Sequence, residues 1–491
     1  MAIEKYKLGD IYFGTADGED EALNFIDNQD EFKNFFFDYD NIVEKALQPL
    51  RYLILGKKGA GKTLLGEYLN YKLNNTTNTF SKVVSFNEFR MHSLRELSAA
   101  DTPPNEYIPI WTYVILIELS KIITTNSILD DNENCLKLKR FISRNYQKLI
   151  LTQNAERDIE RLKSVKLNSD WIGDILTEED KEYIQDSYIS VIPILETIVH
   201  NVIKSKSEFS YNLILDKIDD RFTNTELYKN SVISLIKAVD NFNKNCLRNK
   251  IKAKVTVLLR SDIFSLLNDT DLNKRENSNA VRIDWGDAAR YDSPLFDLVV
   301  KKIKASIPSL KGKEKAEVIR LFFPAYIWQS NREVSTDKFL LGRTLFRPRD
   351  VITYLKLIAE KFPNETSFSP KMFLDVQLRY SEYFLKEIEN EMNGHLEEQQ
   401  IKEVIDLMIK FGKFDFRYPQ IKKFESENRI LTSLSLDDAL KILFDFSIIG
   451  NYVVMGGNKW RHTWKHRHDR VEIDFNKHMC LHYGLWRYFN V

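Results

Sequence analysis

The feature that most constrains this chain is the segment GKKGAGKT at residues 56–63, which satisfies the phosphate-binding pattern G-x-x-x-x-G-K-[ST]. A short apolar run, RYLIL at 51–55, precedes it, and the helical apolar spacing of TLLGEYLNYKL at 63–73 follows it. Strand, glycine-rich turn and helix in this order form the context in which the pattern binds phosphate. The alternative, a glycine-rich turn with a chance lysine, is disfavoured because the chain has only 17 glycines among 491 residues.

Each residue type of this loop has a physical role in holding phosphate. Glycines leave room for backbone N–H groups to face the β- and γ-phosphate oxygens, and the N-terminus of the following helix adds partial positive charge. We expect Lys62 to neutralise the phosphates and Thr63 to ligate Mg²⁺, so ATP and Mg²⁺ are the expected cofactors. The predicted nucleotide-binding residues of the loop are Gly56, Gly59, Ala60, Gly61, Lys62, Thr63 and Leu64.

Further β-strands are predicted at three β-branched or aliphatic runs of buried-strand length, SKVVSF (81–86), YNLILD (211–216) and AKVTVLLR (253–260). Long helical patterns separate these runs, which predicts an α/β fold with a parallel sheet. The roughly 125 residues between the second and third strands are almost wholly helical in pattern, more than such a connection needs. Residues 130–205 are therefore predicted to form a helical insertion.

A carboxylate at the tip of a neighbouring strand completes a magnesium shell in this type of site. Asp216 ends the apolar run NLIL and is the predicted metal-shell residue. Asp219 or Asp220, within one turn of it, is expected to orient and polarise the attacking water as a catalytic group. The alternative for all three residues is a solvated acidic loop, and it has more weight for the last two.

Three arginines are candidates for contacts to the nucleotide. Arg260 ends the strand at 253–260 and is predicted to sense the γ-phosphate, with a surface salt bridge as the alternative. Arg347 and Arg349 flank Pro348 at a predicted helix start, where cations are unfavourable unless an anion faces them. We expect them to be lid contacts to nucleotide or to an acid, and a coincidence of helix capping is the alternative.

Charge and composition limit the class of protein. Lys and Arg number 71 and Asp and Glu also number 71, so the formal net charge is zero. A charged partner would therefore have to bind at a local patch of the opposite charge. Three cysteines scattered without CxxC pairing argue against a disulfide framework, and neither a signal peptide nor a membrane-length apolar run is visible. We therefore expect a soluble, cytoplasmic protein with no membrane partner.

The predicted organisation has four parts. Residues 1–45 form an N-terminal segment in which nine acids between 17 and 40 are interleaved with phenylalanines, which predicts packed helices with an acidic face. Residues 46–285 form the phosphate-binding core, and the strands are expected to stop at about 286. Residues 286–395 are predicted to be a helical lid. In 396–491, a helix capped by Ser435 and a hairpin, NYVVM-GGN-WRHTWK, predict a winged helix.

Four motifs in order carry a resemblance to known proteins: GKKGAGKT, LILDKIDD, LLRSDIF and FRPRDVI. They resemble the ASCE-class P-loop ATPases at the border of the STAND and AAA+ classes. The opening LGDIYFGTADGEDEA and the ending FSIIGNY with HYGLWRYF resemble a group of bacterial orphan P-loop ATPases often found in phage-defence neighbourhoods. Asp220 stands where the STAND pattern has Glu, and Lys217 replaces the commoner Gly. The resemblance implies nucleotide-gated assembly or signalling.

The segment 459–470 combines five Lys or Arg residues with two tryptophans and three histidines. A basic, aromatic wing of this kind can lie along the phosphates of DNA or RNA, whereas the alternative is docking against the acidic N-terminal region. The histidines and Cys480 also invite a zinc interpretation, which the absence of paired ligands at finger-like spacing disfavours.

The sequence thus predicts an ATP-binding and hydrolysing P-loop ATPase that acts as a nucleotide-gated conformational or oligomeric switch. Its expected partners are ATP and ADP, a homo-oligomer or a separately encoded effector protein, and DNA or RNA through residues 459–470. The resemblance adds antiviral defence as the setting. The alternative is a non-hydrolysing, ATP-dependent scaffold or nucleic-acid sensor that binds through the basic wing.

Overall fold

The computed structural model describes residues 6–86, 107–145, 188–220, 222–329, 332–455, 459–468 and 470–490. The chain divides into two compact units. The first, called the α/β unit here, comprises Asp17–Lys57 and Gly61–Ile283. The second, called the C-terminal unit, comprises Met1–Ala16, Lys58–Ala60 and Asp284–Val491, so three residues of the glycine-rich loop group with it. The division into four parts by residue range stays a prediction.

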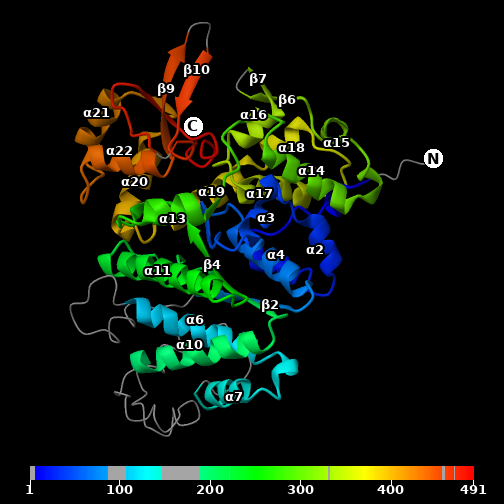
Figure 1. Cartoon of the computed structure of the whole chain (residues 1–491). Helices are drawn as coiled ribbons and strands as arrows, with labels where there is room; N and C mark the ends of the chain where they lie inside the picture. The colour runs from blue at the N-terminus through cyan, green and yellow to red at the C-terminus, as the bar shows by residue number, and fades with distance from the viewer. Residues whose placement is uncertain are drawn as a thin grey trace. The chain divides into compact units, whose positions relative to one another are not determined.

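The α/β unit is built on a five-stranded parallel sheet of order β2-β3-β4-β1-β5 (Figure 1). The strands are β1 (Leu53–Gly56), β2 (Thr79–Ser85), β3 (Ser210–Asp216), β4 (Ala253–Arg260) and β5 (Ala280–Ile283). The four predicted strands are confirmed, and β5 was not predicted. Because β4 lies between β1 and β3, the strand that precedes the glycine-rich loop and the strand that ends in Asp216 are not neighbours. This is the α/β P-loop fold.

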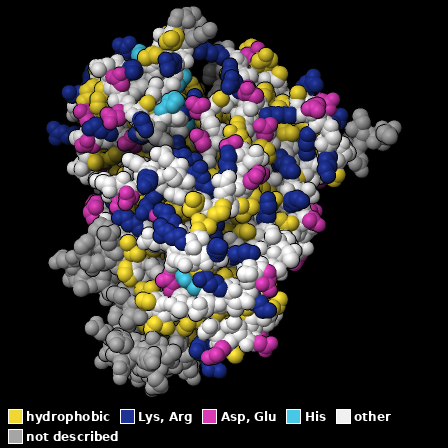
Figure 2. Space-filling view, in the orientation of Figure 1, with side chains coloured by type: hydrophobic (Ala, Val, Ile, Leu, Met, Phe, Trp, Pro, Cys, Tyr) yellow, Lys and Arg dark blue, Asp and Glu magenta, His cyan; other side chains and the backbone are white. Residues whose placement is uncertain are grey.

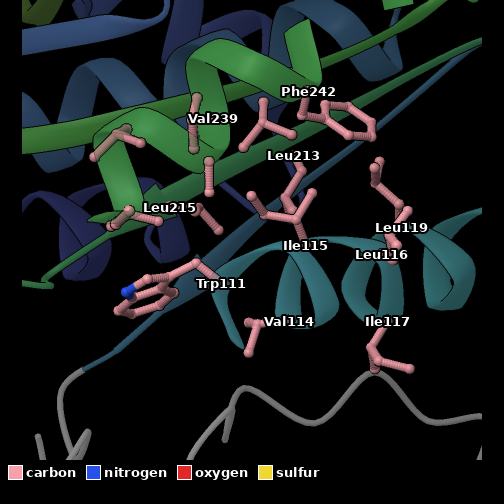
Figure 3. Packing of buried hydrophobic residues seen from close by; sticks show 14 of the residues in the cluster. Trp111, Val114, Ile115, Leu116, Ile117, Leu119, Leu213, Leu215, Val239 and Phe242 are labelled. Carbon is pink, nitrogen blue, oxygen red and sulfur yellow. The ribbon is translucent and has the colours of Figure 1, made fainter. Parts of the chain in front are cut away.

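Helices of this unit pack on the sheet or on one another through apolar side chains. They are α4 (Lys62–Asn74), α6 (Ile108–Ile123), α7 (Glu133–Asn145), α10 (Tyr188–Ser205), α11 (Glu226–Arg248), α12 (Ser261–Leu266) and α13 (Leu272–Asn279). Helix α6 packs against β3, α10 and α11, which explains why it is buried around almost its whole circumference. Figure 3 shows Ile115 of α6 beside Leu213 of β3, in the apolar cluster that also contains Trp111 of α6 and Phe242 of α11.

The described parts of the predicted insertion are the helices α7 and α10, 146–187 lies outside the described residues, and the insertion as a unit stays a prediction. The acidic N-terminal segment also folds as expected, into α1 (Gly18–Leu23), α2 (Gln29–Phe35) and α3 (Ile42–Leu47). Its phenylalanines pack on α4, since the rings of Phe36 and Tyr68 stack with centroids 3.7 Å apart. Six of the nine acids are exposed, whereas Asp17 and Glu19 are half-buried and Glu21 is buried.

The C-terminal unit is mainly helical, but the expectation that strands stop at about 286 was wrong. Its first helices are α14 (Pro294–Ser306), α15 (Lys315–Phe322), α16 (Thr336–Leu341), α17 (Pro348–Lys361), α18 (Pro370–Asp375) and α19 (Gln377–Met392). A hairpin of β6 (Tyr326–Gln329) and β7 (Arg332–Ser335) interrupts them. Each strand is only four residues long, and the second, REVS, carries no apolar run that would mark a strand in the sequence.

The end of the chain combines three helices with a four-stranded antiparallel sheet of order β10-β9-β11-β8. The helices are α20 (Glu398–Phe411), α21 (Tyr418–Asn428) and α22 (Leu436–Asp445), and the strands are β8 (Asp415–Phe416), β9 (Ile449–Met455), β10 (Lys459–Thr463) and β11 (His478–Leu481). The Ser435 cap is confirmed, since its side chain accepts from the N–H of Asp438. The β9–β10 hairpin is confirmed as well, and the winged-helix assignment stays a prediction.

Two surface properties complete the description. None of the described helices is long and apolar enough to cross a membrane. On the face drawn in Figure 2, basic and acidic side chains are interspersed, as the equal numbers of the two charges lead one to expect.

Candidate nucleotide-binding site

The glycine-rich loop connects the buried end of β1 to the first residue of α4. Gly59 and Gly61 adopt positive φ angles of 76° and 95°, a conformation that only glycine accepts without strain. The ammonium of Lys62 donates to the carbonyl oxygens of Gly56 (3.2 Å) and Lys57 (3.4 Å). The loop is thus shaped by its glycines, and Lys62, the first residue of α4, reaches back over the loop's own start.

Asp216 and Thr63 meet at the carboxyl end of the sheet, as the sequence predicted for a metal shell. The carboxyl of Asp216 is 3% exposed and accepts a hydrogen bond from the Thr63 hydroxyl. Burial raises its pKa to about 6, and the Thr63 hydrogen bond and the Lys62 charge offset the rise only in part. A buried carboxylate beside a hydroxyl is an oxygen donor set that suits Mg²⁺, and the cation would supply the missing counter-charge. The residues present fit Mg²⁺ at this position.

Two residues near the site were not predicted to belong to it: Glu67, which the sequence did not single out, and Lys217, which was noted only as a replacement of the commoner Gly. Glu67 follows Thr63 by four residues, so both lie on one face of α4. Burial, with the neighbouring charges of Glu19 and Asp216, raises the pKa of Glu67 to about 7. Lys217, which follows Asp216, has a left-handed backbone (φ 57°) and its ammonium pairs with Glu19 at 2.5 Å. The four-residue spacing from Thr63 could have identified Glu67, whereas the partner of Lys217 depends on tertiary packing.

The acidic residues beyond β3 differ in their surroundings. Asp219 is buried, and its carboxylate accepts from the backbone N–H of Arg260 at 2.6 Å. This hydrogen bond ties the loop after β3 to the end of β4. Asp220 is exposed. A water-orienting role for either residue stays a prediction.

Arg260 lies at the end of β4, directly opposite Gly56 of β1 in the sheet register. Its guanidinium forms a two-point ion pair with Asp262, with Nε–Oδ1 and Nη2–Oδ2 distances of 3.2 and 2.6 Å. Burial favours a higher pKa for Asp262, but the charge and hydrogen bonds of Arg260 outweigh it and lower the pKa. The alternative of an ion pair holds, although the Arg260 side chain is only 10% exposed and is not on the surface. Its contact with the γ-phosphate stays a prediction.

Arg347 and Arg349 begin α17 of the C-terminal unit and contact acids, one of the two partner types expected for them. Arg347 is buried and pairs with Asp350 and with Glu391 of α19. It also donates to the carbonyl of the loop residue Lys58 at 3.3 Å, within the same unit. Burial opposes its charge, but the two carboxylates raise the pKa of Arg347 well above its ordinary value. Arg349 pairs with Glu387 at 2.8 Å, and a nucleotide contact stays a prediction for both.

The basic segment 459–470 is less uniformly exposed than its composition indicates. Arg461 and Arg470 are exposed, but Lys465 pairs with Asp445, and the Arg467 guanidinium stacks over the Phe346 ring at 4.7 Å. The side chain of Lys459 lies outside the described residues. Within the described ranges, no group of three or more His, Cys, Asp or Glu side chains could hold a metal ion.

Comparison with known proteins gives two matches. A family profile described as the FunZ-associated C-terminal helical domain matches residues 293–389, which is under half of the chain. Among solved structures, the Orc1 protein of Aeropyrum pernix in complex with DNA is 11% identical, with 89% of this chain and 88% of that chain covered and a TM-score of 0.32. At that TM-score the likeness does not carry residue roles from one protein to the other. No curated protein matches the sequence.

Proposed function

We propose that this chain binds ATP with Mg²⁺ at the glycine-rich loop and hydrolyses it. The observation that carries the proposal is the buried Asp216 carboxyl against the Thr63 hydroxyl at the start of α4. Lys62 would contact the β- and γ-phosphates, and the backbone N–H groups of Gly59 to Leu64 would receive the remaining phosphate oxygens. Bound Mg²⁺ supplies positive charge to the phosphates.

Hydrolysis requires a group that orients water, and Asp219 and Asp220 are the candidates on the loop after β3. Arg260 would distinguish ATP from ADP if it exchanged the Asp262 carboxylate for a γ-phosphate. In this proposal the nucleotide state drives a conformational or oligomeric switch that acts on a second copy or a separately encoded effector. The setting in antiviral defence comes from the resemblance of the sequence motifs alone.

Nucleotide binding is tested by titrating a fluorescent ATP analogue with Mg²⁺ into the full chain. Lys62→Ala should lower the affinity at least tenfold, because it removes the point charge at the phosphates. Lys72→Ala, an exposed lysine in the last turn of the same helix, is the matched control and should bind as the wild type does. Equal binding by the Lys62 variant and the control would refute the proposal.

Phosphate release separates the switch from the alternative function. A non-hydrolysing scaffold or nucleic-acid sensor would bind ATP, release no phosphate at saturation, and bind DNA or RNA through the exposed Arg461 and Arg470. We therefore expect turnover that depends on Mg²⁺ and is lost in Asp216→Ala. Binding without turnover, with or without DNA, would favour the scaffold.

A further inference from the structure

Lys217 occupies an unusual place directly after the predicted metal residue Asp216. Its backbone is left-handed, with φ 57°, a conformation that costs a lysine about 1–2 kcal/mol and costs glycine nothing. The side chain is only 12% exposed, and its ammonium lies 2.5 Å from the Glu19 carboxylate, itself 27% exposed. A strained backbone that directs a half-buried ion pair points to a role for the lysine side chain.

The partner, Glu19, belongs to the short helix α1, whose first residue lies against the phosphate-binding helix. Asp17 caps α1 by accepting the Glu19 N–H at 2.7 Å. A Cβ atom built on Gly18 would lie 2.5 Å from the backbone nitrogen of Leu64, in the first turn of α4. There is therefore no room for a side chain at residue 18, and the backbone of α1 packs directly against the first turn of α4.

The charges around this contact make the packing of α1 depend on the ammonium group of Lys217. The charges of Glu19 and Asp216 act on the carboxyl group of Glu67. The charges of Asp17, Glu19 and Asp216 act on the ammonium group of Lys217. Burial disfavours a charged ammonium, but the hydrogen bond with Glu19 and the charges of Asp17 and Asp216 outweigh it and raise the pKa of Lys217. Without the ammonium, Glu19 would face two other acids across a partly buried contact, which repels α1 from the end of β3.

We propose that Lys217 is a positioning residue whose ion pair with Glu19 holds α1 against the first turn of α4 and couples the order of α1 to the metal-binding end of β3. The coupling to nucleotide rests on the proposed function. The ion pair itself does not, because both partners and the packed glycine belong to the α/β unit without any ligand.

Hydrogen exchange of peptides that cover residues 18–23 tests the pair in the full chain without nucleotide. Lys217→Gln and Glu19→Gln should each exchange about tenfold faster than wild type, since charged hydrogen bonds contribute on that scale, and the double variant should not exceed either. Lys217→Arg should preserve protection. Lys217→Gly relaxes the backbone but removes the amine, and it should behave like the Gln variant. Lys229→Gln, which breaks the 3.2 Å pair with Glu226 elsewhere in this unit, is the control.

The coupling is tested by the same measurement with Mg²⁺ and a slowly hydrolysed ATP analogue, at equal nucleotide occupancy in each variant. Wild type and Lys217→Arg should gain protection at 18–23, and Lys217→Gln should not. The ion-pair role would be overturned if, without nucleotide, residues 18–23 of Lys217→Gln or Lys217→Gly exchanged at the wild-type rate. It would also be overturned if the effects of Lys217→Gln and Glu19→Gln on the exchange rate were additive in the double variant. Equal nucleotide-induced protection in wild type and Lys217→Gln would overturn the coupling. If wild type binds no nucleotide, the proposed function fails, while the exchange data without nucleotide still decide the role of the pair.

Discussion

Asp216→Asn should stabilise the protein without ligand while it removes the response to Mg²⁺ and ATP. Burial raises the pKa of Asp216 from its ordinary 3.8 to about 6. Ionisation of this carboxyl group therefore lowers the free energy of unfolding. Each pKa unit is worth about 1.4 kcal/mol, so the difference amounts to ~3 kcal/mol at pH 7.5. Asn keeps an oxygen that can accept the Thr63 hydrogen bond and carries no charge.

The pH dependence of this effect has a definite sign. Because the folded pKa is above the unfolded one, the folded state binds more protons, and stability from this group is lost as pH rises from about 4 through 6. The advantage of Asp216→Asn over wild type should therefore be ~3 kcal/mol at pH 7.5 and about half of that at pH 5.

Urea unfolding of wild type and Asp216→Asn at pH 5 and pH 7.5 measures the difference, and thermal scans should show a Tm higher by roughly 5–10 °C at the upper pH. With Mg²⁺ and ATP at about 100 times the dissociation constant, wild type should gain ~2.7 kcal/mol and the variant far less. A variant that is less stable than wild type at pH 7.5 without ligand would refute the argument, because it would mean that the ionised carboxylate is net stabilising. A difference independent of pH would refute it too.

Three further predictions concern the C-terminal unit. Gly450→Ala should cost about 1–3 kcal/mol of unfolding free energy in urea, because the new methyl group would overlap the buried ring of Trp464. Arg347→Ala should lower the free energy of unfolding by about 3–5 kcal/mol in the same measurement, because it leaves the fully buried Asp350 carboxylate without this partner. Arg349→Ala should lower it by less than about 1 kcal/mol, because the ion pair of Arg349 is partly exposed. Arg461→Glu should reduce the log–log salt slope of any duplex-DNA binding by roughly one to two, and an unchanged slope would exclude a phosphate contact there.

The parts of the fold that were predictable are those with a strong local signal. Strand β4 follows its apolar run from 253 to 260 without error, and the helix after Ser435 begins where its cap does. Strand β5 was missed because its four residues follow a polar helix, and β8 was missed because two residues carry no periodicity. Short strands are fixed by the partner to which they bond, which lies far away in the sequence.

The candidate site divides in the same way. Lys62, Thr63 and Asp216 could be predicted as site residues because each lies at a fixed position relative to a strand or helix end. The anions that face Arg347 and Arg349 were expected, but their identities were not, since Glu387 and Glu391 come from a helix about 40 residues later. Likewise, nothing near Arg467 in the sequence indicates that it stacks on Phe346, more than 100 residues before it.

Three aspartates lie at the end of β3 and in the loop after it, and their surroundings assign them different chemistry. Asp216 is buried against Thr63, where its charge calls for a cation. Asp219 is equally buried, but its carboxylate already accepts the backbone N–H of Arg260, so turning it toward a water would release the end of β4. Asp220 is exposed to solvent in the same loop. In our proposal Asp219 therefore acts on the site through the position of Arg260, and the water-orienting role falls to Asp220.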